Sequence, residues 1–317
     1  MKVSLVIPVY NEVESAPLLH QAIQQALQGR DYEVVYVDDG SRDGSVDVLQ
    51  KLVEESGGHF RLVVLRRNFG QTAALAAGID HSSGEVIVTL DADLQNDPAD
   101  IPALIEKIDE GYDLASGWRV DRQDAALTRR LPSQIANWLI SRVTGVHLHD
   151  YGCTLKAYRR EVLEGFRLYG EMHRFIPAYA GGVGARIVEV PVRHHARRYG
   201  RAKYGLERTL KVVLDLFTVK FLTSYAAKPI YIFGGTGLAM IAGSLVVLIV
   251  LAARRLTLNE HMIRSPLLLL SVMLFILGAQ AILMGLLAEL TVRTYYESQS
   301  KPTYSVRRVV DPAHGTA

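Results

Sequence analysis

The stretch Val88-Thr-Leu-Asp-Ala-Asp-Leu-Gln-Asn-Asp-Pro98 ends an apolar run with two carboxylates, Asp91 and Asp93, separated by one residue. Neighbouring carboxylates repel each other unless a cation lies between them or water solvates both. Asp is common in the turns that follow strands, so the pair is compatible with a solvated turn. It is also typical of a site for a hard divalent cation, which prefers oxygen ligands and often binds a substrate phosphate. The pair alone does not decide between these interpretations.

The surrounding sequence predicts a layered α/β fold. Short runs rich in Val, Ile, Leu and Tyr at 3–8, 31–38, 60–66, 85–91 and 112–117 predict strands, and stretches with helical spacing, such as Leu18, Ala22 and Ala26, lie between them. This alternation favours a mostly parallel sheet with helices on both faces. Ligands bind such sheets beyond the carboxyl ends of the strands. Polar segments follow the first four predicted strands: Pro8-Val-Tyr-Asn-Glu12, Asp38-Asp-Gly-Ser-Arg-Asp43, Arg67-Asn-Phe-Gly70 and the Asp91/Asp93 pair.

Composition excludes several classes of protein. The formal charge is +2 over 317 residues, so nothing indicates nucleic acid as a partner. A single cysteine, Cys153, excludes an internal disulfide and a cysteine-based zinc site. The apolar run at the N-terminus is broken by Pro8 and Asn11 and is too short for a signal peptide, so we expect this domain to stay in the cytoplasm.

Two segments near the C-terminal end predict membrane spans. Mean hydropathy is +0.12, but Ile230–Ala253 and Ser265–Ala288 carry no charge, and each exceeds the roughly 20 residues needed to cross a bilayer. Positive charges are more numerous outside these segments than in the link between them, which favours cytoplasmic termini. The flanking charges are Lys220, Lys228, Arg293, Lys301, Arg307 and Arg308, against Arg254, Arg255 and Arg264 in the link.

The segment before the first span has helical spacing of its apolar residues, Leu206, Leu210, Val213, Phe217 and Phe221. It is either an ordinary amphipathic surface helix or, as we prefer because a membrane span follows it, a helix lying in the membrane interface. The expected organisation is a cytoplasmic domain at 1–203, an interfacial helix at 204–228, and the two spans at 229–317 with a loosely ordered polar tail after Lys301.

The residues suggest chemistry on a nucleotide-linked group. Asp91 and Asp93 could bind Mg²⁺ or Mn²⁺ together with a diphosphate, and Asp38 or Asp39 could accept hydrogen bonds from a base or ribose. Neither a phosphate-binding P-loop nor a dinucleotide fingerprint after a strand is present. A cationic group, best represented by Arg197-Arg-Tyr-Gly-Arg-Ala-Lys203 before the amphipathic segment, suggests an anionic lipid head group as acceptor.

These motifs together resemble the family 2 glycosyltransferases with the GT-A fold, specifically the polyprenyl-phosphate glycosyltransferase branch. That branch includes dolichol-phosphate mannose synthases, bactoprenol glucosyltransferases and undecaprenyl-phosphate 4-deoxy-4-formamido-L-arabinose transferases. The resemblance extends through both predicted spans. It is carried by Val6-Ile-Pro-Val-Tyr-Asn-Glu12, Asp38-Asp-Gly-Ser41, Asn68-Phe-Gly-Gln71, Leu90-Asp-Ala-Asp-Leu-Gln95, Asp150-Tyr-Gly-Cys-Thr-Leu-Lys-Ala-Tyr-Arg159 and Arg197-x-x-Gly-x-Ala-Lys-Tyr204.

The resemblance implies a role for each matching residue. Asp150 and Asp93 are the expected catalytic residues, with Asp150 an orienter or a modest base. Ala202 stands where many relatives have Ser, so any contact of that hydroxyl with the acceptor is missing here. The implied metal ligands are Asp91, Asp93 and Gln95. The implied nucleotide-sugar site consists of Pro8, Tyr10, Glu12, Asp38, Asp39, Asn68, Gln71, Asp91 and Ala92. The implied acceptor-phosphate site consists of Arg119, Arg130, Arg197 and Lys203.

The resemblance implies transfer of a sugar to undecaprenyl phosphate with inversion of the anomeric centre and with Mg²⁺ or Mn²⁺ as cofactor. UDP-glucose is the donor expected first. The reaction would take place at the inner membrane and serve modification of the cell envelope. UDP-4-deoxy-4-formamido-L-arabinose, GDP-mannose and a UDP-N-acetylhexosamine stay open as donors, and a homo-oligomer, possibly a tetramer, is expected. A processive polysaccharide synthase should carry a Q-x-x-R-W motif, which is absent. A non-catalytic nucleotide-sugar sensor should have lost a metal or basic residue, and none is obviously lost.

Overall fold

The computed structural model describes residues 1–120, 137, 140–142, 144–164, 168, 172–196, 230–258, 265–298 and 304–312. The chain divides into two compact units. Unit 1 comprises Met1–Val219 together with Pro302–Ala317, and unit 2 comprises Lys220–Lys301. The interfacial helix expected at 204–228 lies outside the described residues, so its existence stays a prediction.

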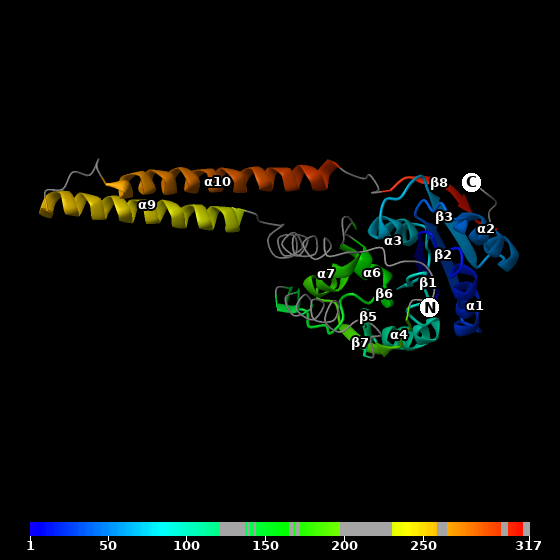
Figure 1. The fold of residues 1–317 in the computed structure, drawn as a ribbon. Coiled ribbons are helices and arrows are strands. Elements are labelled where there is room, and N and C mark those ends of the chain that lie inside the picture. The colour runs from blue at the N-terminus through cyan, green and yellow to red at the C-terminus, as the bar shows by residue number, and fades with distance from the viewer. Residues whose placement is uncertain are drawn as a thin grey trace. The chain divides into compact units, whose positions relative to one another are not determined.

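Unit 1 is built on a mixed sheet with the strand order β7-β5-β6-β4-β1-β2-β3-β8 (Figure 1). The pairs β1–β2, β1–β4, β2–β3 and β5–β7 are parallel, whereas β6 runs antiparallel to β4 and β5, and β8 runs antiparallel to β3. The sheet predicted from the five apolar runs is therefore confirmed, and three further strands extend it. The strands are β1 (Val3–Val9), β2 (Tyr32–Asp38), β3 (Phe60–Leu65), β4 (Val86–Thr89), β5 (Leu114–Arg119), β6 (Lys156–Arg159), β7 (Ile187–Val192) and β8 (Val306–Val310).

Helices cover both faces of this sheet, as predicted. Successive side chains of a strand point to opposite faces, and Leu5 and Ile7 of β1 pack in one hydrophobic cluster while Val6 packs in another. The first cluster includes side chains of α1 (Ala16–Ala26), α2 (Ser45–Ser56) and α4 (Ile101–Asp109). The opposite face is covered by α3 (Gln71–Asp80), α6 (Arg160–Leu163) and α7 (Ile176–Gly182), with short 3-10 turns η1 (Pro98–Asp100) and η3 (Met172–Phe175) beside them.

The helical spacing expected around Leu18, Ala22 and Ala26 is present in α1, and a neighbouring stripe of this helix packs on the sheet. Leu18 is 42% exposed, whereas Leu19, Ile23 and Leu27 are fully buried. Helical spacing alone does not decide which stripe of a helix meets the sheet, because that depends on tertiary packing.

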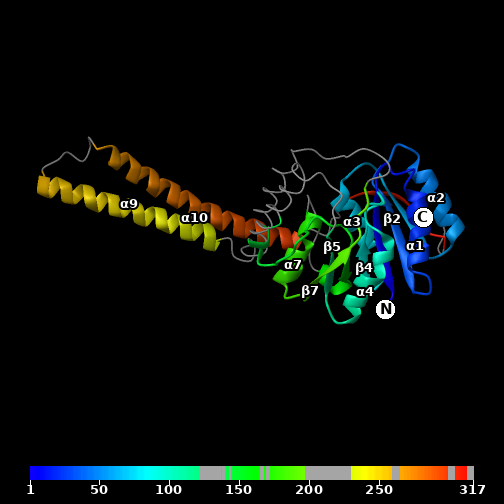
Figure 2. The ribbon, with the colours of Figure 1, turned by 60° about the horizontal axis from the view of Figure 1, so that its bottom comes forward.

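Unit 2 is a pair of long apolar helices, α9 (Ile230–Leu258) and α10 (Pro266–Ser298), which run side by side in both views (Figures 1 and 2). The segments Phe233–Thr257 and Pro266–Ala288 are long and apolar enough to cross a membrane, and only 17% and 11% of their most apolar windows are buried. The helices approach closely where a Cβ added to Gly237 would lie 2.5 Å from the carbonyl oxygen of Gly278. Small residues permit such close approach between membrane helices.

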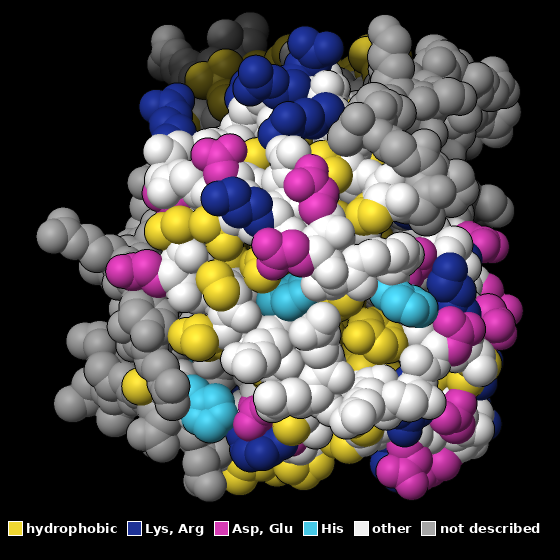
Figure 3. Space-filling view, turned by 90° about the vertical axis from the view of Figure 1, so that its right-hand side faces the viewer, with side chains coloured by type: hydrophobic (Ala, Val, Ile, Leu, Met, Phe, Trp, Pro, Cys, Tyr) yellow, Lys and Arg dark blue, Asp and Glu magenta, His cyan; other side chains and the backbone are white. Residues whose placement is uncertain are grey.

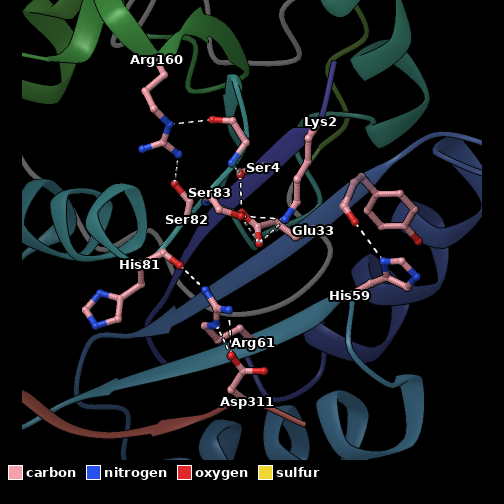
Figure 4. Close-up of polar contacts among 12 residues, drawn as sticks. Lys2, Ser4, Glu33, His59, Arg61, His81, Ser82, Ser83, Arg160 and Asp311 are labelled. Atoms are coloured by element: carbon pink, nitrogen blue, oxygen red, sulfur yellow. Dashed lines mark hydrogen bonds and ion pairs between the residues drawn. The ribbon is translucent and has the colours of Figure 1, made fainter. Parts of the chain in front are cut away.

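The polar tail, expected to be loosely ordered, instead contributes β8 to the sheet of unit 1. Val310 of β8 pairs with Leu62 of β3 and is 2% exposed. The Arg61 guanidinium lies 2.7 Å from Asp311 and also donates to the His81 carbonyl oxygen at the end of α3 (Figure 4). The chain therefore leaves unit 1, forms the helical hairpin, and returns to the same sheet.

The surface of unit 1 carries charges of both signs. On the face drawn in Figure 3, acidic and basic side chains lie interspersed, with exposed hydrophobic groups scattered between them. This distribution is typical of a solvated surface.

Candidate active site

The loops that follow β1, β2 and β3 are joined by hydrogen bonds. The Asn11 N–H donates to Ser41 Oγ at 2.9 Å, and the Arg42 N–H donates to Asn11 Oδ1 at 2.8 Å. Asp39 then links the second loop to the third, because its carboxylate accepts from the backbone N–H groups of Phe69 at 2.7 Å and Gly70 at 2.9 Å. The polar segments predicted to converge at the carboxyl ends of the strands are therefore neighbours.

Asp38, the last residue of β2, is fully buried. Its Oδ2 accepts from the N–H groups of Gly40 and Ser41, each at 3.1 Å. Within the described part of the chain, Oδ1 is buried and has no hydrogen-bond partner. Burial raises the pKa of the Asp38 carboxyl, opposed by the hydrogen bonds from Ser41 and Gly40. A buried oxygen of this kind is costly unless a further donor satisfies it.

Asp39 is also nearly buried, with 3% exposure. Burial raises its pKa, and the two N–H donors from the loop after β3 oppose that shift. Since both of its oxygens accept from the backbone, Asp39 braces the loop that contains Asn68 and begins α3 at Gln71. Of the two neighbouring aspartates, Asp38 is the one with an oxygen not used by the described chain.

The first loop contributes residues with different surroundings. Pro8 pairs with Val37 inside the sheet, and Tyr10 follows β1 and is partly exposed. Glu12 is 8% exposed; its N–H donates to Ser45 Oγ at 2.9 Å, and its Oε2 accepts from Ser15 Oγ at 2.9 Å. Glu12 thus connects the beginnings of α1 and α2.

Asp91 and Asp93 lie in the turn directly after β4. Gln71 Nε2, at the first residue of α3, donates to Asp91 Oδ1 at 2.7 Å. Asp93 is 9% exposed and accepts from the Gln95 N–H at 3.1 Å. Between them Ala92 is buried, and Leu94 has a left-handed backbone with φ of +60°. Such a conformation is strained for a residue with a branched side chain, and strain of this kind concentrates at functional sites.

The donor set of this turn suits a hard cation. Among the described residues no three His, Cys, Asp or Glu side chains cluster as a metal cage would require. Mg²⁺ commonly binds through one or two carboxylates and completes its coordination with water and substrate phosphates. Two carboxylates one residue apart, with Gln95 close by, fit that pattern.

Topology brings Asp150 to the same edge. Because β6 is antiparallel to β4, with Lys156 opposite Thr89, the segment that precedes β6 lies where β4 ends. Asn96 Nδ2, in the loop after β4, donates to Thr154 Oγ1 at 3.1 Å and ties the two segments together. The second half of the predicted site therefore lies beside the Asp91/Asp93 turn.

Asp150 is engaged by Arg119, the last residue of β5. Arg119 Nε lies 2.7 Å from Asp150 Oδ2, and Nη2 lies 2.9 Å from Oδ1, a two-pronged ion pair. Asp150 is 2% exposed and the Arg119 side chain 13%. Paired charges with two parallel hydrogen bonds are strong and geometrically specific. Arg119, expected to bind the acceptor phosphate, thus holds the carboxylate of Asp150 here.

Three of the expected phosphate-binding residues, Arg130, Arg197 and Lys203, lie outside the described residues and stay predictions. Two residues with contacts around Asp150 were missed by the sequence analysis. Lys156 is part of the quoted motif around Asp150 but had no assigned role, and Glu189 of β7 had no signal in the sequence. Glu189 accepts from the backbone N–H of Asp150, and Lys156 donates to the carbonyl oxygen of Tyr151 beside it.

The family model for glycosyl transferase family 2 matches residues 4–166. The chain belongs to this family. It is 43% identical to a dodecaprenyl-phosphate galacturonate synthase of Rhizobium johnstonii, over 98% of this chain and 94% of that protein. It is 41% identical to an undecaprenyl-phosphate 4-deoxy-4-formamido-L-arabinose transferase of Enterobacter sp., again over 98% and 94% of the two chains.

Solved structures support the GT-A fold of unit 1. Glucosyl-3-phosphoglycerate synthase from Mycobacterium tuberculosis, in complex with Mn²⁺, UDP and glucosyl-3-phosphoglycerate, is 18% identical and has a TM-score of 0.52, covering 70% of this chain and 79% of that chain. At this identity the likeness concerns the fold alone. The prediction of a family 2 glycosyltransferase with a GT-A domain is therefore confirmed.

Proposed function

We propose that this glycosyltransferase moves a sugar from a nucleoside-diphosphate donor to a polyprenyl phosphate. The observation that carries this proposal is the identity of 43% and 41% to two transferases named for such lipid acceptors, over nearly the whole chain, including the helical hairpin. The hairpin supports a membrane location for the acceptor. Since the chain enters the hairpin from unit 1 and returns to it at β8, both ends of the hairpin belong on the same side of the membrane, which we propose is the cytoplasmic side of the inner membrane.

For the donor, we favour a galacturonosyl or 4-deoxy-4-formamido-L-arabinosyl nucleotide over the UDP-glucose expected from the sequence, because these are the sugars in the names of the two relatives. The base would be recognised beside β2, where Asp38 Oδ1 is a buried acceptor that a base N–H or a ribose hydroxyl could satisfy. Asp39 would contribute indirectly, by holding the loop from Asn68 to Gln71.

The reaction would be a single displacement. An oxygen of the acceptor phosphate, already anionic near neutral pH, attacks the anomeric carbon from the face opposite the leaving group. The new carbon–oxygen bond forms as the bond from that carbon to the diphosphate breaks, and the nucleoside diphosphate leaves with the electron pair. The anomeric centre is therefore inverted.

The residues of this chain would prepare that displacement. Asp91 and Asp93 would hold a divalent cation, which when bound supplies charge neutralisation for the departing diphosphate. Gln71 fixes the orientation of Asp91. Asp150 would orient the acceptor phosphate through Arg119, since the phosphate needs little proton abstraction and the carboxylate is already held by that guanidinium.

The test is transfer of radiolabelled sugar into organic-extractable lipid by the full-length protein in detergent. The panel contains undecaprenyl and dodecaprenyl phosphate, UDP- and GDP-linked sugars including both favoured donors, and Mn²⁺ or Mg²⁺ with an EDTA control. We expect one donor to label the lipid, EDTA to abolish labelling, and Asp93→Asn to lose it while Asp109→Asn, an exposed carboxylate at the end of α4, behaves as wild type. A folded wild-type protein that labels no lipid with any donor would overturn the proposal.

A further inference from the structure

The turn at 149–153, which carries Asp150, is held at its start by a carboxylate from another strand. Glu189 Oε1, in β7, accepts from the N–H groups of His149 at 2.8 Å and Asp150 at 3.2 Å. Its Oε2 lies 2.7 Å from His149 Nδ1, and the Glu189 side chain is 13% exposed. Both oxygens of Glu189 are therefore directed at the two residues where the turn begins.

The end of the same turn is held by a buried ammonium group. Lys156 Nζ donates to the carbonyl oxygen of Tyr151 at 3.3 Å and to that of Cys153. The residue is 2% exposed, and burial lowers the pKa of its ammonium group. A buried amine is costly unless hydrogen bonds compensate for lost water. Here those bonds go to backbone carbonyls of the turn.

The carboxylate of Asp150 takes its position from this backbone. Besides the ion pair with Arg119, its Oδ1 accepts from the Gly152 N–H at 3.2 Å. The Trp118 ring stacks on His149 with centroids 4.4 Å apart and planes at 17°. Trp118 and Arg119 are consecutive in β5, so this one strand contacts both the His149 ring of the turn and the Asp150 carboxylate.

We propose that Glu189 and Lys156 are positioning residues for sugar transfer. Glu189 binds the N–H groups at the start of the turn and Lys156 binds the carbonyls at its end, so opposite charges meet opposite backbone dipoles and fix the Asp150 carboxylate against Arg119. The inference rests on the proposed function, in which the Asp150–Arg119 pair orients the acceptor phosphate. Both positioning residues act on Asp150 through the backbone of the turn. A displacement of about 1 Å at a reacting centre costs on the order of 100-fold in rate.

The test compares Glu189→Ala, Glu189→Gln and Glu110→Ala in the full-length protein. Glu110 is an exposed carboxylate that pairs with Lys107 at 2.7 Å, far along the chain from the turn. We expect Glu189→Ala to lower kcat about 10- to 100-fold with the donor KM and the affinity for UDP unchanged. Glu189→Gln keeps an amide oxygen that can accept from both N–H groups and should restore most of kcat, and Glu110→Ala should match wild type.

Hydrogen exchange supplies a readout independent of activity. In Glu189→Ala the amides of His149 and Asp150 lose their acceptor, so a peptide covering 149–153 should exchange faster than in wild type or Glu110→Ala. Lys156→Met should likewise speed the exchange of this peptide and lower kcat, and Lys156→Arg should change both by less. If Lys156→Met does not fold, the Glu189 variants decide the question.

Three outcomes separate the possibilities. Faster exchange with a lower kcat that Glu189→Gln restores supports the inference. Unchanged exchange, or wild-type kcat in Glu189→Ala, overturns it while leaving the proposed function intact. A wild-type protein that transfers no sugar overturns the proposed function itself.

Discussion

Gly40 and Gly44, beside the proposed nucleotide site, distinguish backbone strain from a steric clash as the cost of replacing a glycine. Both lie between β2 and α2 and both have a left-handed backbone, with φ of +72° and +92°. A Cβ at Gly40 would lie 2.6 Å from the carbonyl carbon of Arg67 and 2.7 Å from the backbone nitrogen of Asn68, whereas at Gly44 nothing lies within 4 Å. Gly40→Ala therefore adds strain and a backbone clash, and Gly44→Ala adds strain alone.

The magnitudes follow from these two contributions. A left-handed backbone costs a residue with a Cβ about 1–2 kcal/mol, so Gly44→Ala should lower the free energy of unfolding by that amount. Overpacking against atoms that cannot move aside adds about 1–3 kcal/mol, so the loss for Gly40→Ala should be roughly 2–5 kcal/mol. If the clash is relieved by moving the Arg67–Asn68 backbone, the added cost appears in nucleotide binding as a loss of roughly 5- to 150-fold.

The assay is titration of UDP in the presence of Mn²⁺ into each full-length variant, with thermal unfolding of the same samples. Gly44→Ala should lower the Tm and leave the Kd for UDP close to wild type, while Gly40→Ala should lower the Tm further and raise the Kd. Equal Tm values together with equal UDP affinities in the two variants would refute the reasoning, because only the clash with the loop after β3 distinguishes them.

Three further predictions concern the hairpin, the C-terminal strand and the cysteine. A Cβ at Gly278 would lie 2.7 Å from the Gly237 carbonyl oxygen, so Gly278→Val should lower the Tm in detergent. Gly243→Val is the control, because a Cβ there would have nothing within 4 Å, and it should lower the Tm much less. Equal losses of Tm would contradict the close crossing of the two helices. The side chains of Arg61 and Asp311 are 25% and 11% exposed, so their ion pair is partly shielded from water. A double-mutant cycle with Arg61→Met and Asp311→Asn, measured by hydrogen exchange of the β8 amides, should give a coupling free energy of about 1–3 kcal/mol. A coupling near zero would mean that packing alone holds β8. Burial raises the pKa of Cys153 to about 11, so maleimide should label it at pH 8 only after denaturation, and rapid labelling of the native protein would contradict its burial.

The sequence predicted the parts of the site that belong to continuous segments. Buried parallel strands read as apolar runs, so the ends of β1 to β4 could be located and their polar residues expected at one edge. Asp91 and Asp93 could be predicted as a pair from the end of one strand and from their spacing of one residue. The hairpin was predicted for the same reason, since length and absence of charge are properties of a segment and not of its neighbours.

The sequence did not predict interactions whose partners are distant in the chain. Asp311 meets Arg61 across 250 residues, and a five-residue strand such as β8 has no signal beyond a few valines among charges. The helical spacing of α1 is visible in the sequence, but the burial of Leu19 and Ile23 and the exposure of Leu18 depend on how the helix packs on the sheet.

The sequence by itself determined the fold class, the paired carboxylates, the location of Asp150 at the start of its motif, and the two apolar helices, because each is written in local composition and spacing. Only the tertiary structure decided that Arg119 pairs with Asp150, that Asp39 braces a loop while Asp38 keeps an oxygen unused by the described residues, and that Glu189 and Lys156 hold the turn between them. Asp39 meets Phe69 across 30 residues, Arg119 meets Asp150 across 31 and Glu189 meets Asp150 across 39, whereas Lys156 bonds carbonyls within five residues and depends on the fold for its burial. The contacts around Asp150 depend in addition on the antiparallel insertion of β6 between β4 and β5, which no single segment encodes.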